Sequence, residues 1–265
     1  MNLHTLYLTN NACYKAGRTI TPKGIMVHST GANNPRISRY IAPDDGLIGE
    51  NIGGNHWNTD EPGGINVCVH AFIGKLADGS SATYQTLPWN YRGWHAGGKA
   101  NDSYVGFEIC EDGLTDPAYF YAVYTEAVEL CVYLCKQYGL TEKNIICHSE
   151  GHKLGIASNH ADVMHWFPKH GKSMDTFRAD VKADLFKQED ENMTQDTFNK
   201  LMSTWQDQND PLYKTLEDVP SYWNDDAAAL VKAGAIKGDG VDSFCIRQSV
   251  LKAAIINKRY VDSIK

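Results

Sequence analysis

The chain has 265 residues, of which 42% are hydrophobic and 22% charged, and its formal net charge is -7. This size and composition predict one sizeable buried core and leave room for a second, small module. The negative charge argues against nucleic acid as the main partner, and no apolar stretch approaches the roughly 20 residues that a membrane span needs.

The amino-terminal sequence and the cysteines indicate where the protein is made. Met1 to Thr5 lacks the basic and then apolar layout of a signal peptide, so we expect synthesis in the cytoplasm without one. The chain has an odd number of cysteines, seven. Most of them lie in apolar predicted strands or a predicted helix: Cys68, Cys110, Cys131, Cys135 and Cys147. This pattern is typical of reduced, packed thiols in a protein made in the cytosol.

The first predicted strand with a functional candidate is the apolar run Ile25 to Val27. It lies between the turn-forming Pro22-Lys23-Gly24 and Ser29-Thr30-Gly31, so His28 stands at its carboxyl end. A strand end is a rigid mount for a functional side chain. A lone histidine there is more often a hydrogen-bonded structural residue than a metal ligand, so His28 alone does not define a site.

A later apolar strand, Tyr104 to Cys110, carries one charged side chain in its middle, Glu108. A carboxylate in such a strand is unfavourable unless it is functional or paired with a cation, and both alternatives stay open. A long helix should follow, because Asp116 is a good N-cap, Pro117 suits the first helical position and Gly139 ends the apolar repeat. A second helix is predicted from about Met174 to Phe186.

His148 follows another predicted strand, Asn144 to Cys147. His148 and His152 are four residues apart, as in a zinc-binding helix, but Ser149 stands where that motif needs its glutamate, and Gly151 weakens a helix. We do not expect Cys147 to be a ligand, because strand alternation points it to the opposite face. Metal hydrolysis needs about three protein ligands that leave a position open, plus an unligated acid or base. Histidines and carboxylates in three separated segments supply these parts.

Together these segments resemble the zinc-dependent N-acetylmuramoyl-L-alanine amidases of the amidase-2 type, which share their fold with the peptidoglycan recognition proteins. The resemblance covers roughly residues 20–170. It rests on the order and spacing of GIMVHSTGA, VHAFIGKLADGSSATYQTLPWNYRGWHAGG, VGFEICED and residues 148–167. It implies an α/β fold with a mixed central sheet flanked by helices. The strands that carry His28, His70 and Glu108 and the strand before His148 should be adjacent and end at one edge.

The resemblance also implies the site. His28, His148 and Asp162, five residues before Phe167, would bind one zinc ion per chain, with a water as fourth ligand. Zinc lowers the pKa of its water from ~16 toward ~7. Glu108 would take the proton of that water and return it to the leaving amine.

One position departs from the common family pattern. His160 stands where most members have a lysine that stabilises the oxyanion, and it resembles some staphylococcal autolysin amidases, which share the fourteen-residue interval between His148 and Asp162. A histidinium can donate to an oxyanion. A rival assignment stays open, in which His160 is the ligand and Asp162 its partner.

Other histidines receive weaker assignments. By resemblance, His70, Trp94 and His95 would be substrate-binding residues of the cleft. For His70 two roles stay open, a hydrogen-bond donor near the zinc water or a residue that merely lines the cleft. The remaining histidines are expected in loops or at the surface, with His165 beside Trp166: His4, His56, His152, His165 and His170.

The composition changes after residue 186, where the catalytic domain, residues 1–186, should end. The charged run 187–192 favours a linker, residues 187–210, in which Thr194 caps a short amphipathic helix carrying Phe198, Leu201, Met202 and Trp205. Residues 211–265 should form a small helical module. The run YKTLEDVPSYWNDDAAALVKAGAIKGDG is similar to one unit of the surface-layer-homology modules, and a packing or dimerising appendage is the alternative.

Three functional classes are compatible with these features. The first is a muramoyl amidase of phage or prophage origin, an endolysin that is released through a holin and cleaves bacterial peptidoglycan. The second is a non-catalytic peptidoglycan-binding protein, although no ligand is missing here. The third is a zinc peptidase or amidase acting on another substrate. The sequence does not predict the oligomeric state.

Overall fold

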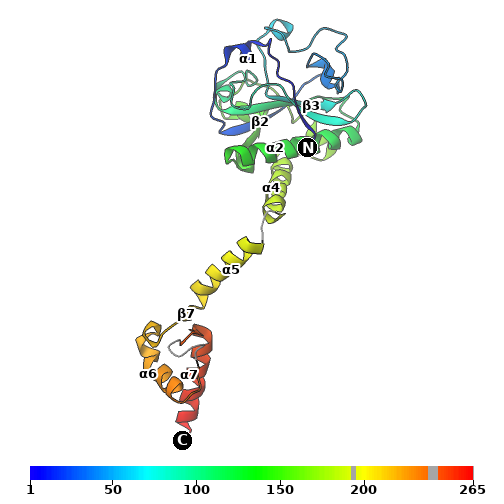
Figure 1. Ribbon diagram of the computed structural model, residues 1–265. Coiled ribbons are helices and arrows are strands. Elements are labelled where there is room, and N and C mark those ends of the chain that lie inside the picture. Colours follow the sequence, from blue (N-terminus) through cyan, green and yellow to red (C-terminus); the bar gives the residue numbers. More distant parts are fainter. Residues whose placement is uncertain (192–194, 238–243, 265) are drawn as a thin grey trace. The chain divides into compact units, whose positions relative to one another are not determined.

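A computed structural model describes residues 1–191, 195–237 and 244–264 (Figure 1). The chain divides into two compact units, Met1–Glu189 and Asp190–Lys265. Among the described residues, no helix is both long and apolar enough to span a membrane.

A six-stranded sheet forms the centre of the first unit in the described residues. Its strands, in spatial order, are β1 (Leu3–Thr5), β4 (Ser81–Gln85), β3 (Ala71–Lys75), β5 (Tyr104–Ile109), β2 (Gly24–Ser29) and β6 (Ile145–Cys147). Only β3 and β4 pair antiparallel, and the other neighbours pair parallel. This confirms the predicted mixed sheet, in which β3, β5, β2 and β6 are adjacent.

The two faces of the sheet differ in chemistry. Ile25 and Val27 of β2 and Phe107 of β5 belong to the larger hydrophobic core, which they share with α2 (Pro117–Tyr138). The α2 helix runs across this face of the sheet (Figure 1). Since successive side chains of a strand point to opposite faces, His28 and Glu108 lie on the other face. The apolar core therefore fixes the strands, and the opposite face carries His28 and Glu108 together with a second apolar cluster that includes Phe72 and Tyr84.

The helix α2 begins and ends as the sequence predicts. The Asp116 side chain accepts hydrogen bonds from the backbone N–H groups of Ala118 and Tyr119, at 2.9 and 3.2 Å. Gly139 ends the helix with a φ of 64°, a left-handed conformation that glycine adopts without strain.

Three further helices complete the first unit: α1 (Ala12–Ala16), α3 (His148–Lys153) and α4 (Met174–Glu191). The α4 helix buries Met174, Phe177 and Val181 against the core. The α4 helix continues past residue 186, the predicted end of the catalytic domain, to Glu191, so the first residues of the predicted linker are helical. Lysine, glutamine and glutamate are good helix formers, so a charged run can extend a helix. Thr194, the expected cap, lies outside the described residues.

The second unit contains α5 (Gln195–Asn209), α6 (Ser221–Lys232), α7 (Gln248–Ser263) and a short antiparallel pair, β7 (Leu212–Tyr213) with β8 (Ile246–Arg247). The expected amphipathic helix is α5, and its apolar residues Phe198, Leu201, Met202 and Trp205 are exposed. A separate small core includes Ala227 of α6 and Leu251 and Ile255 of α7. Part of the predicted glycine-rich turn, Gly238 to Gly240, lies outside the described residues.

Cys68 corrects the expectation of reduced thiols. It forms a disulfide with Cys13, 55 residues earlier in the chain. Four of the other cysteines are free and buried, as expected of packed thiols: Cys110, Cys131, Cys135 and Cys147. The disulfide joins α1 to the segment before β3, so it closes a long loop of chain between residues 13 and 68.

We expect the double substitution Cys13→Ala and Cys68→Ala to lower the free energy of unfolding by about 2–4 kcal/mol, because closing a loop of this length removes conformational entropy from the unfolded chain. Guanidinium denaturation of both proteins measures the difference. The matched control is Cys245→Ala, which removes an exposed free thiol and should leave the midpoint unchanged. A double variant as stable as the wild type would contradict a stabilising role for the bond.

Candidate metal centre

The parallel pairing of β5, β2 and β6 brings together side chains from distant parts of the sequence. His28 of β2 lies opposite Glu108 of β5 in the strand register. Immediately after β6, His148 begins α3. Since the carboxyl ends of parallel strands meet at one edge of a sheet, all three residues lie at that edge, and Asp162 reaches it from the loop after α3.

Three side chains converge with the spacing that a metal ion requires. His28 Nδ1 lies 3.1 Å from Asp162 Oδ2 and 3.1 Å from His148 Nδ1, and His148 Nδ1 lies 3.7 Å from Asp162 Oδ2. Ligand atoms around tetrahedral zinc, with bonds of about 2.0–2.1 Å, are about 3.3 Å apart. His28, His148 and Asp162 can therefore hold one metal ion through these three atoms.

The electrostatics of the ligands suit a cation. Burial and the neighbouring His28 lower the pKa of His148 to about 4, so His148 is neutral near pH 7, which is the form that binds metals. The pKa of Asp162 lies below its ordinary value, because its hydrogen bond with His28 and the nearby His28 and His148 outweigh the opposing effect of burial. The site therefore offers the neutral imidazole of His148 and the Asp162 carboxylate beside His28.

Glu108 is close to this group but does not belong to it. Its Oε2 atom is buried and has no hydrogen-bond partner among the described residues. Burial raises the pKa of Glu108 well above its ordinary value, and the carboxylates of Asp162 and Glu111 add to this shift. An unpaired buried carboxylate is unfavourable for folding, so the alternative of a structural ion pair receives no support. A free, basic oxygen beside a metal site can exchange protons with a water molecule.

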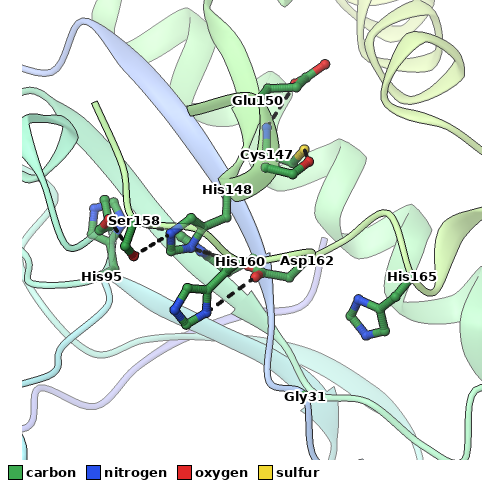
Figure 2. Close-up of polar contacts among 12 residues, drawn as sticks. Gly31, His95, Cys147, His148, Glu150, Ser158, His160, Asp162 and His165 are labelled. Carbon is green, nitrogen blue, oxygen red and sulfur yellow. Dashed lines mark hydrogen bonds and ion pairs between the residues drawn. The ribbon is translucent and has the colours of Figure 1, made fainter. Parts of the chain in front are cut away.

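His160 lies outside the converging group. Its side chain is 62% exposed, its Nδ1 is 4.0 Å from Asp162 Oδ1, and its ring stacks on that of His148 with centroids 4.6 Å apart. Figure 2 shows the His148 ring between Ser158 and Asp162, with His160 beside them. The geometry favours Asp162 as ligand over the rival assignment and leaves His160 at the open side of the site.

His70 does not reach the substrate side, in contrast to the expectation. It precedes β3 and is fully buried. Its Nδ1 accepts a hydrogen bond from the Gly106 N–H at 3.0 Å, and its Nε2 donates to the Tyr91 carbonyl at 2.8 Å. Burial lowers the pKa of His70 to about 4. Because both ring nitrogens are engaged by the backbone, His70 is a structural residue in this fold.

His95 and Trp94 have different environments although they are neighbours in sequence. Both nitrogens of His95 are occupied, Nδ1 by His28 Nε2 at 2.9 Å and Nε2 by the Tyr104 carbonyl at 3.2 Å. His95 therefore contacts His28 where substrate contact was expected. Trp94 is 43% exposed, with the Arg92 guanidinium 4.9 Å from its ring centroid, and stays available to a substrate.

Several supporting residues carry no signal in the sequence. Glu111 is buried and accepts hydrogen bonds from His165 Nε2 at 2.8 Å and from the Gly31 N–H at 3.2 Å. It thus joins the loop after β2 to the loop after Asp162. Ser158 Oγ contacts His148 Nε2 at 3.1 Å. A serine or a second glutamate has many roles in proteins, so only the folded structure identifies these partners.

The fold places a candidate metal centre, with a carboxylate beside it, at the edge of a mixed sheet. The family described as N-acetylmuramoyl-L-alanine amidase, Amidase_2, matches residues 18–166, which is more than half of the chain. The protein belongs to this family of peptidoglycan amidases. No curated protein matches the chain.

Solved structures of similar fold include the hydrolase AmiA of Staphylococcus aureus in complex with its ligand. It is 20% identical, with a TM-score of 0.50, and the alignment covers 71% of this chain and 83% of AmiA. PlyL is 20% identical, with a TM-score of 0.47, covering 69% of this chain and 96% of PlyL. A mutant endolysin from Bacillus subtilis is 22% identical, with a TM-score of 0.46, covering 68% and 99%. At 20% identity the likeness to AmiA concerns the fold alone.

Proposed function

We propose that this protein hydrolyses the amide bond between the lactyl group of N-acetylmuramic acid and L-alanine in bacterial peptidoglycan, using one zinc ion held by His28, His148 and Asp162. The observation that carries the proposal is the convergence of the three ligand atoms within 4.8 Å of one another, beside the buried Glu108 Oε2 atom, which has no hydrogen-bond partner among the described residues. Membership of the amidase family supports the substrate class.

The residues of the site have separate roles in hydrolysis. When bound, zinc supplies Lewis acidity, which polarises the scissile carbonyl and makes water a stronger acid. Glu108 accepts a proton as the water oxygen bonds to the carbonyl carbon. It then donates this proton to the alanine nitrogen as the carbon–nitrogen bond breaks. His160, at the open side of the site, donates a hydrogen bond to the oxygen that gains negative charge.

The biological setting is also a proposal. We infer that the protein acts on the wall as an endolysin, with residues 1–186 as the catalytic domain, 187–210 as a linker and 211–265 as a wall-binding module. The Cys13–Cys68 disulfide supports action outside the cytoplasm, because such bonds persist in oxidising surroundings.

Digestion of purified cell wall tests the reaction. The zinc-loaded protein should release new L-alanine amino termini and leave the glycan strands intact, and a chelator should stop the release. Absence of any product would indicate the binding protein, and other new amino termini would indicate a peptidase. Either outcome would reject the proposed activity.

The substitution His160→Ala should leave one zinc per chain and lower turnover on the order of 100-fold, the typical effect of losing one oxyanion donor. His160→Lys should restore part of the rate, because lysine supplies a cation over a similar reach. Metal analysis and kinetics of the two variants measure both effects. Loss of zinc from His160→Ala would show instead that His160 is a ligand, with Asp162 as its partner.

A further inference from the structure

The second ring nitrogen of His28 has a defined partner. If Nδ1 of His28 binds the metal, its proton must be on Nε2, which lies 2.9 Å from Nδ1 of His95. That nitrogen of His95 must then accept the hydrogen bond and carry no proton. The proton of the His95 ring is therefore on Nε2, which donates to the Tyr104 carbonyl at 3.2 Å. One pair of tautomers satisfies every contact.

The His95 ring is closely packed against the backbone at Gly106 and Gly93. A Cβ atom at Gly106 would overlap the ring, and one at Gly93 would come within 2.9 Å of its Cδ2. Asn101 fixes the backbone at this point, because its Oδ1 accepts hydrogen bonds from the N–H groups of His95 and Ala96, both at 2.9 Å. The ring therefore has little freedom to turn away from His28.

The other histidine ligand is held from the same segment. His148 Nε2 lies 3.1 Å from Ser158 Oγ, which can donate to the Ala96 carbonyl at 3.3 Å. Residues 95 and 96 thus reach both histidine ligands, His28 directly and His148 through Ser158. Asp162, the carboxylate ligand, and His160 lie on the remaining side of the site.

We propose that His95 is a positioning residue, which holds His28 in the tautomer and orientation that aim Nδ1 at the metal. The role rests on the proposed zinc-dependent function. A hydrogen bond to the far nitrogen of a ligating histidine fixes its ring and strengthens it as a ligand. His95 would therefore act on metal affinity, and it need not touch the substrate.

A matched pair of variants isolates this hydrogen bond. Asparagine and leucine have similar size, but only asparagine offers an acceptor, its Oδ1, near the place of the imidazole Nδ1. His95→Leu should weaken zinc binding by a factor of about 10 to 100, as changes to such outer partners do. His95→Asn should stay within a few-fold of the wild type. Zinc affinity is measured by competition with a chelator, together with the melting temperature of each metal-free protein.

The control is His152→Asn, which changes an exposed histidine of α3 and should leave zinc affinity unaltered. Wild-type affinity in a folded His95→Leu protein would overturn the proposal, and so would equal weakening in both variants, which would indicate packing alone. If the leucine variant does not fold, the asparagine variant tests the proposal by itself, and a loss of its zinc affinity would overturn the proposal. A wild type that binds zinc in a His95-dependent manner but releases no alanine termini would reject only the proposed function.

Discussion

Glu108→Gln is expected to retain one zinc per chain and to lower kcat by a factor of about 100 to 10,000, the usual contribution of a general acid–base group. Glutamine has almost the same shape, but it cannot accept the proton of the attacking water. Glu108 lies beside His28 in the sheet, and its Oε2 atom has no partner among the described residues, so the carboxylate is free for this role. Zinc content and turnover on cell wall, measured on one preparation, separate the two effects.

The same substitution should stabilise the metal-free fold. Burial raises the pKa of Glu108 above its unfolded value, so ionisation opposes folding, and the stability present at low pH is lost as the pH rises toward the folded pKa. Glutamine removes this loss, and the melting temperature of the metal-free variant at pH 7 should exceed that of the wild type. The control is Glu111→Gln, a buried glutamate whose Oε1 accepts two hydrogen bonds, and this variant should keep most of the turnover. Near-normal turnover in Glu108→Gln would contradict the acid–base role and show that Glu108 is a structural residue.

His148→Ala is expected to abolish both zinc binding and turnover. The remaining ligands, His28 and Asp162, are too few to retain zinc against a chelator, since catalytic zinc sites use about three protein ligands. Elemental analysis and wall digestion measure the loss. Chelation of the wild type should produce the same inactive state, and added zinc should restore the wild type but not the variant.

The matched control is His152→Ala. His152 is four residues from His148, as in a zinc-binding helix, but it does not belong to the converging group. Its removal should therefore leave zinc and turnover unchanged. Stoichiometric zinc in His148→Ala, or loss of zinc from His152→Ala, would contradict the assigned ligand set.

Strand ends were predictable because their signals are local. An apolar run followed by polar turn residues places His28 and His148 at the carboxyl ends of two strands, which pair parallel in the structure and bring both residues to one edge of the sheet. Glu108 stands out for the same reason, as a single charge in an apolar strand. The family resemblance then supplied Asp162, whose loop has no such pattern.

Other features depend on tertiary packing that the sequence does not encode locally. His70 and His95 both lie near the site. The ring nitrogens of His70 contact backbone groups, and Nδ1 of His95 contacts His28, and neither contact could be predicted from the local sequence. The pairing of Cys13 with Cys68 depends on where α1 packs, and connectivity cannot be deduced from cysteine positions alone.

Mass spectrometry of wall fragments tests the central claim most directly. Purified peptidoglycan is treated with the zinc-loaded wild type, the chelated wild type and Glu108→Gln. The account predicts free peptides that begin with L-alanine, together with glycan strands carrying an unsubstituted lactyl carboxylate, from the zinc-loaded wild type alone. New glycan reducing ends, cleavage within the stem peptide, or equal release by Glu108→Gln would contradict it.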